Sequence, residues 1–144
     1  MKKCLLLLGP VLFSLALQGN VREMITPEKP MTKTIRFSVY ASGNYSKSIY
    51  KQSKATILLS IWKYKGKSRE QVWEGTIDAG KLRDFPSADN ALFREVNLYD
   101  VKEHKQMLVA GYKVIYDSKG STLAYDQGFI IPVGDSAKTV TVKL

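Results

Sequence analysis

The amino-acid sequence predicts an all-β protein, a single two-layer antiparallel β-sandwich of about seven strands, preceded by a cleaved signal peptide. Short segments in which apolar and polar residues alternate recur along the chain, as is typical of half-buried strands. Turn-forming residues separate these segments, and no convincing helical stripe follows the N-terminus. We therefore expect a signal peptide over residues 1–18, an irregular lead-in or tether over residues 19–32, and the sandwich over residues 33–144.

The N-terminus has the organisation of a secretory signal peptide. Two lysines follow Met1, and residues 4–17 form an apolar run. A membrane-spanning helix needs about 20 apolar residues, so this run is short for an anchor. Ser14 and Ala16 place small residues where signal peptidase requires them, and Gly19 offers a second cleavage position.

Cys4 is the only cysteine of the chain. A lipidated cysteine would follow the apolar run, whereas Cys4 precedes it, so a secretory signal is preferred to a bacterial lipoprotein anchor. Loss of Cys4 with the leader leaves a mature chain that can form no internal disulfide. We expect this mature chain to be secreted or periplasmic, with membrane contact that is at most peripheral.

The first two strands are predicted from their alternation. Residues 34–40 alternate apolar with polar side chains, and residues 41–54 form a loop rich in serine and lysine. This loop carries Tyr45 and Tyr50 on otherwise polar backbone. Residues 55–65 have apolar side chains on both faces, which indicates a central strand.

A hairpin should follow the central strand. The turn at residues 66–68 leads into an expected strand over residues 70–77. Residues 78–90 contain glycine, proline and several cap-forming residues, so we expect them to cross the surface. Leu82 and Phe85 should hold this segment against the body of the protein.

Residues 91–101 fit two patterns. Apolar residues three or four positions apart fit a short helix, while Val96 and Leu98 fit the alternation of a strand. We expect a strand over residues 93–98 because strand patterns dominate on both sides, with the helix as the alternative. The alternation over residues 138–144 predicts a terminal strand.

Residues 106–133 predict a long β-hairpin. Asp117 suits the first position of a type I turn, and Gly120 supplies a left-handed residue to close it. Either Tyr116 or Asp117 then lies opposite Ser121. The first register keeps nearly all apolar residues on one face, pairing Val114 with Leu123, Tyr112 with Tyr125, Ala110 with Gln127 and Leu108 with Phe129. We prefer it because a one-residue slip moves every side chain to the opposite face.

The number and spacing of these strands resemble an immunoglobulin-like or transthyretin-like layout. The resemblance is architectural and involves no residue-level motif. The Cys-Trp-Cys pattern of immunoglobulin domains is absent from the sequence.

The chain is basic, with a formal net charge of +9. Its densest basic run comprises Lys63, Lys65, Lys67 and Arg69, which alternate along an extended segment. A solvated strand face that discourages edge-to-edge aggregation explains this run better than a polyanion site. We therefore expect no nucleic-acid partner.

Few residue patterns in the sequence indicate a catalytic, metal-binding or phosphate-binding site. Asp100, Glu103 and His104 would share a metal ion only if this segment were helical, and a solvated charged loop is the preferred interpretation. The sequence has neither a Gly-x-Ser-x-Gly nucleophile elbow nor a glycine-rich phosphate loop. We predict no catalytic residue, no metal site and no cofactor, and hence no enzyme.

Two binding functions remain. The preferred hypothesis is a non-catalytic protein-interaction or structural module of a bacterial cell-envelope or extracellular assembly. The alternative is a glycan-binding module in which Tyr45, Tyr50 and Trp62 or Trp73 form a stacking platform for sugar rings. Trp62 and Trp73 lie on neighbouring predicted strands, where core packing explains them better than a binding surface does.

Overall fold

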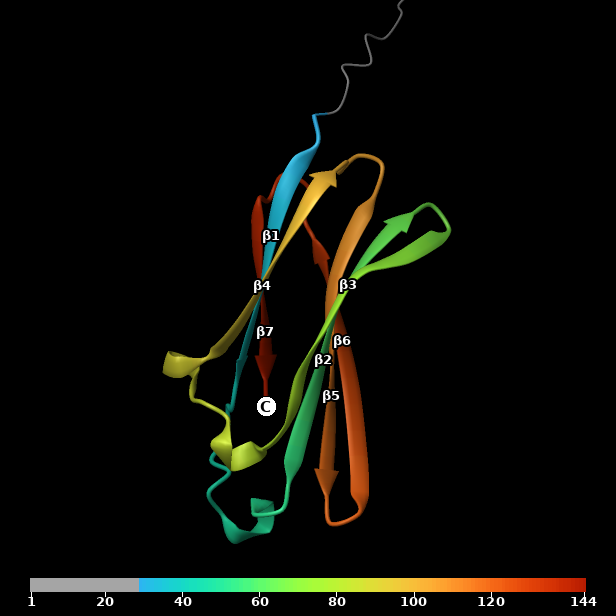
Figure 1. The fold of residues 1–144 in the computed structure, drawn as a ribbon. Helices are drawn as coiled ribbons and strands as arrows, with labels where there is room; N and C mark the ends of the chain where they lie inside the picture. The colour runs from blue at the N-terminus through green and yellow to red at the C-terminus, as the bar shows by residue number, and fades with distance from the viewer. Residues whose placement is uncertain (1–28) are drawn as a thin grey trace, which may run out of the picture.

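The structure, a computed structural model, describes residues 29–144 and contains two β-sheets packed face to face (Figure 1). The smaller sheet has the order β4-β1-β7, with β4 (Leu92–Val101), β1 (Met31–Tyr40) and β7 (Ala137–Lys143). The larger has the order β3-β2-β5-β6, with β3 (Ser68–Lys81), β2 (Lys54–Lys65), β5 (Met107–Ser118) and β6 (Ser121–Ile131). This architecture confirms an all-β sandwich of seven strands.

Most predicted elements occur close to their expected bounds. The segment with two interpretations forms strand β4, and β2 is a central strand of its sheet. Leu82 is buried and Phe85 packs against the core, as expected for the segment after β3. Short 3-10 helices complete the described chain: η1 (Ser48–Tyr50), η2 (Leu82–Asp84) and η3 (Ala88–Asn90).

The N-terminal boundary of the sandwich differs from the prediction. Strand β1 begins at Met31, two positions before the expected start at Lys33. The last residues of the predicted tether therefore belong to the sheet. The predicted signal peptide and residues 19–28 of the tether lie outside the described residues.

The smaller sheet is not wholly antiparallel, contrary to the prediction. Strands β1 and β7 run parallel, with Phe37 beside Val140 and Val39 beside Val142. Alternation shows which residues share a face, but it does not show strand direction, so this parallel pairing could not be predicted from the alternation. In a constant-type immunoglobulin domain the first, second, fourth and fifth strands share a sheet. Here β1 and β4 are in one sheet and β2 and β5 in the other, so the immunoglobulin-like layout is wrong.

The β5–β6 hairpin forms, but both predicted registers are wrong. Lys119 and Gly120 have φ values of 48° and 83°, so a two-residue turn joins Ser118 to Ser121. The preferred register is displaced by two residues, and each side chain therefore remains on its predicted face. The error arose because a left-handed lysine is uncommon and Asp117-Ser118 resembles the start of a longer turn.

The core lies between the two sheets and follows the predicted alternation. Side chains with no exposed surface come from both sheets: Ile35, Phe37, Val39, Ala55, Ile57, Ile61, Ala110, Val114 and Val142. They occupy every second position of their strands, as a half-buried pleated strand requires. Burial of these apolar groups supplies the main stabilisation of the sandwich.

Lys33 is a charged side chain buried among these apolar residues, with 2% of its surface exposed. Its ammonium donates hydrogen bonds to the carbonyls of Pro132 (2.8 Å) and Asp135 (2.7 Å) and forms a salt bridge with Glu103. The Glu103 carboxylate also accepts the Gly134 N–H at 3.0 Å. The network thus joins β1 to the β4–β5 and β6–β7 connections, both of which pass from one sheet to the other.

The Glu103 carboxylate should make stability depend on acid pH. Its hydrogen bond to Lys33 holds the pKa of Glu103 below its usual value of 4.5. Because the folded-state pKa is the lower one, the stabilisation is present above pH 4.5 and is lost as the pH falls through the folded-state pKa. We expect Glu103→Gln to lower the free energy of unfolding at neutral pH by about 3 kcal/mol and to make its decline in acid shallower.

Denaturant unfolding at neutral and acidic pH measures both effects. Glu70→Gln is the matched control, because Glu70 pairs with Lys63 at 2.8 Å on the surface. Such an exposed pair contributes less than about 1 kcal/mol. If Glu70→Gln and Glu103→Gln lowered the free energy of unfolding equally, the buried Lys33–Glu103 pair would contribute no more than a surface pair.

Candidate functional site

The structure separates the four aromatic residues of the predicted platform. Tyr45 and Tyr50 lie together in the loop before β2, with ring centroids 5.1 Å apart and perpendicular rings. Trp62 lies eight positions beyond the start of β2, roughly 25 Å along the strand. Trp73 stacks on Phe37 with ring centroids 5.7 Å apart and packs against the core. The two tyrosines are thus distant from Trp62, and Trp73 serves the interior.

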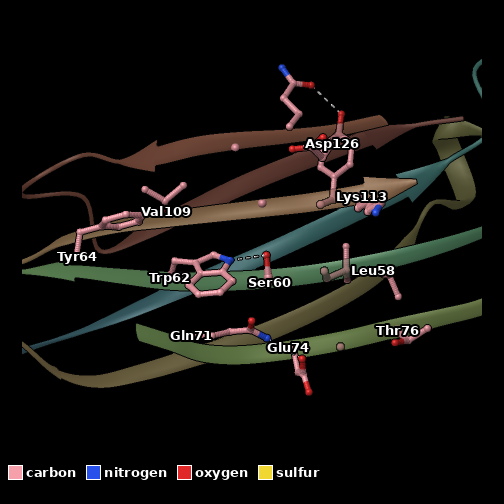
Figure 2. Close-up of a pocket in the computed structure, with 16 residues that line it drawn as sticks. Leu58, Ser60, Trp62, Tyr64, Gln71, Glu74, Thr76, Val109, Lys113 and Asp126 are labelled. Carbon is pink, nitrogen blue, oxygen red and sulfur yellow. Dashed lines mark hydrogen bonds between the residues drawn. The ribbon is translucent and has the colours of Figure 1, made fainter. Parts of the chain in front are cut away.

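Trp62 borders a groove on the outer face of the larger sheet (Figure 2). Three small residues lie side by side across the strands at its floor: Ser60 of β2, Gly111 of β5 and Gly128 of β6. Longer side chains flank this row on both sides: Trp62 and Val109 on one, and Leu58, Lys113 and Asp126 on the other. We call this hollow the outer groove. Its volume of about 700 Å³ lies within the usual range for ligand sites.

The two glycines keep the outer groove open. A Cβ atom on Gly111 would lie 3.1 Å from the Gln127 carbonyl oxygen, which is closer than ordinary contact allows. A Cβ atom on Gly128 would lie 3.3 Å from Val109. Any other residue at these positions would therefore crowd the floor of the groove and begin to fill it.

Polar groups surround the indole ring of Trp62. Its N–H donates to the Ser60 hydroxyl at 3.1 Å (Figure 2). The Arg69 guanidinium lies over the ring, 5.1 Å from its centroid. On β3, the Gln71 amide donates to the Glu74 carboxylate at 2.6 Å. The groove thus combines an aromatic ring with hydrogen-bond donors and hydrogen-bond acceptors.

A second candidate surface is the free edge of β7, which no described strand pairs with. Leu144 directs its N–H to the Tyr40 carbonyl and accepts the N–H of Ser42, so its backbone groups face β1. Successive residues of a strand point their backbone groups in opposite directions. Thr139, Thr141 and Lys143 therefore point theirs away from β1. One of these groups, the Lys143 carbonyl, accepts the Tyr125 hydroxyl at 3.1 Å.

The inner face of β6 lies beside this edge and is largely uncovered. The larger sheet is one strand wider than the smaller sheet, and β7 lies over β5 rather than β6. Leu123 is 68% exposed and Tyr125 is 37% exposed, although both point to the core side of the sheet. We call the β7 edge and these β6 residues the open edge.

An aromatic cluster borders the open edge and was not predicted from the sequence. Tyr125 stacks on Tyr116 and meets Tyr112 edge to face, with centroids 6.2 and 6.0 Å apart. Tyr112 also stacks on Phe129 and donates its hydroxyl to the Gln127 amide oxygen at 2.8 Å. Burial and then the charge of Tyr125 raise the pKa of Tyr112 to about 12. Tyr112 and Tyr116 recur on one face of the same strand, and this spacing was the sequence pattern that could have indicated the cluster.

The segment that carries His104 does not form the helix that a metal site would have required. Asp100 belongs to β4, and the following residues form a turn. The Glu103 carboxylate is engaged by Lys33 and Gly134. Across residues 29–144 no three metal-ligating side chains of His, Cys, Asp or Glu lie together. Within the same range, no helix has the length and apolar character needed to cross a membrane.

Comparisons of the chain with protein-family models, with curated proteins and with solved structures found no match.

The raised tyrosine pKa predicts a loss of stability in alkali. The folded protein keeps Tyr112 neutral beyond its usual pKa of 10.0, so the stabilisation is complete below pH 10 and is lost as the pH rises through about 12. We expect Tyr112→Phe to make this alkaline decline shallower while it lowers stability at neutral pH by about 1 kcal/mol, because the bond to Gln127 is lost.

Denaturant unfolding at a series of alkaline pH values measures this effect. Tyr99→Phe is the control, because Tyr99 is 71% exposed. A decline in alkali that is as steep in Tyr112→Phe as in the wild type would contradict the assignment.

Proposed function

We propose that this chain is an exported, non-catalytic protein-interaction module of a bacterial cell-envelope or extracellular assembly, with a transthyretin-like rather than an immunoglobulin-like layout. The observation that carries the interaction is the open edge, where an unpaired strand borders an uncovered apolar face. Strand edges and exposed apolar patches are both surfaces through which proteins associate. The export part of the proposal is supported by the N-terminal sequence alone.

The open edge fits a partner that adds an extended strand to β7. Backbone groups of Thr139 and Thr141 would pair with the partner strand, since they point away from β1. Every second side chain of that strand would then cover Leu123, Tyr125 and Phe129. The result would be two sheets of equal width.

The charges at this edge favour an acidic partner strand. Lys138 and Lys143 lie at the two ends of β7. Lysine on an edge strand discourages indiscriminate pairing, since a second lysine-flanked strand would be repelled. A strand with apolar residues at alternate positions and carboxylates at its ends would be accepted instead.

The glycan-binding alternative, in the form that combines Tyr45, Tyr50 and Trp62 or Trp73, is not supported, because the two tyrosines are distant from Trp62 and Trp73 packs against the core.

A crosslinking experiment tests the interaction in cells that express the full chain. We expect a photo-crosslinking side chain at Leu123 to yield one discrete protein adduct, and the same group at Tyr99 to yield none. Thr141→Pro removes a backbone N–H that points away from β1, together with an exposed side chain, at a position where proline is tolerated in an edge strand. It should reduce the Leu123 adduct about tenfold, since one hydrogen bond is lost and the ring hinders pairing.

Phe93→Pro is the matched control, because Phe93 lies on β4, at the opposite edge of the same sheet. Circular dichroism verifies that both variants fold. Adducts of equal yield at Leu123 and Tyr99, or a Leu123 adduct unaffected by Thr141→Pro, would refute strand addition at the open edge.

Export has its own test. The protein recovered from the periplasm or the medium should begin at residue 17 if the signal peptide ends at Ala16, or at residue 20 if it ends at Gly19. Protein that remains in the cytoplasm with Met1 attached would refute export without affecting the proposed interaction surface.

A further inference from the structure

We propose that the outer groove is a binding site for a neutral oligosaccharide. The site is separate from the open edge, because the two surfaces lie on opposite faces of the larger sheet. The proposal therefore does not depend on the proposed function. It rests on the direction of the groove, the charges that line it and the groups around Trp62.

The direction of the groove excludes recognition by strand addition. Its floor runs across β2, β5 and β6 through Ser60, Gly111 and Gly128. Both β2 and β5 are paired on either side, so their backbone groups are already used by the sheet. A ligand in the groove must be recognised by side chains, which is how β-sheet faces bind small molecules and sugars.

The charges of the groove are balanced and favour a neutral ligand. The charged groups are the carboxylates of Glu74 and Asp126, the Lys113 ammonium and the Arg69 guanidinium that lies over Trp62. A nucleic acid or sulfated glycan would be attracted by the two cations and repelled by the two carboxylates, so it would gain no net electrostatic stabilisation. The same holds, with the signs reversed, for a cationic ligand. A neutral ligand with many hydroxyl groups can donate to the carboxylates and accept from the ammonium.

The aromatic side of the groove suits a pyranose ring. Sugars present apolar C–H faces that pack on aromatic rings, while their hydroxyls bond to amides and carboxylates at the ring edge. The Arg69 guanidinium already lies over Trp62, so a sugar that packs on this face of the indole takes the place of the guanidinium, which can then bond to the sugar hydroxyls. Gln71 and Glu74 supply an amide and a carboxylate beside the ring (Figure 2). The glycine floor then lets the next sugar unit approach the backbone.

A glycan array of neutral oligosaccharides, followed by calorimetric titration of the best ligand, tests the proposal on the full mature chain. We expect binding of at least one neutral oligosaccharide. Trp62→Ala should weaken that binding at least tenfold. Gly128→Leu fills the groove from the edge strand β6 without removing any polar group, and it should have a similar effect.

Two controls separate the site from general effects of substitution. Trp73→Phe alters the other tryptophan, which packs against the core, and should bind the sugar as the wild type does. Thr141→Pro alters the open edge and should also leave sugar binding unchanged, so that the two proposals fail independently. An array without signal, a preference for sulfated glycans, or wild-type affinity in both Trp62→Ala and Gly128→Leu would overturn the proposal.

Discussion

The buried ammonium of Lys33 is the interaction on which the arrangement of the two sheets depends. A charge in an apolar interior is tolerated only when its partners surround it, and here those partners are a carboxylate and two carbonyls from the inter-sheet connections. Together with the bond from the Thr34 N–H to the Ser136 carbonyl at 2.8 Å, they fix where β7 begins. From that point β7 runs beside β1 in the same direction, and its other edge is paired with no described strand.

Alternation in the sequence predicted the strands, the central place of β2 and the separation of inner from outer faces. It did not predict the exact strand pairing, because registers that differ by two residues leave every side chain on the same face. The wrong register predicted for the β5–β6 hairpin shows what is lost when pairing is unknown. In the preferred register, Gly111 would lie opposite Asp126. The true register places Gly111 beside Gly128, and only this pairing creates the floor of the outer groove.

Lys33 and Trp73 show the same limit in the core. Lys33 occupies an inward position of β1, yet a lysine in an alternating segment predicts an exposed face. Its partners could not be recognised locally, because they lie 70 to 102 positions further along the chain. Trp62 and Trp73 belong to adjacent strands with an irregularity between them, so their faces were undetermined until pairing was known. Local patterns identify elements, whereas these sites are made by distant residues.

The parallel β1–β7 pair also bears on how the protein folds. The pair joins the first described strand to the last, for example Phe37 to Val140, and such contacts of great sequence separation slow folding. The central strand β1 of the smaller sheet lacks one neighbour until β7, about 100 residues further along the chain, has been synthesised. The smaller sheet, and with it the core between the two sheets, therefore cannot be completed until β7 is available to pair with β1.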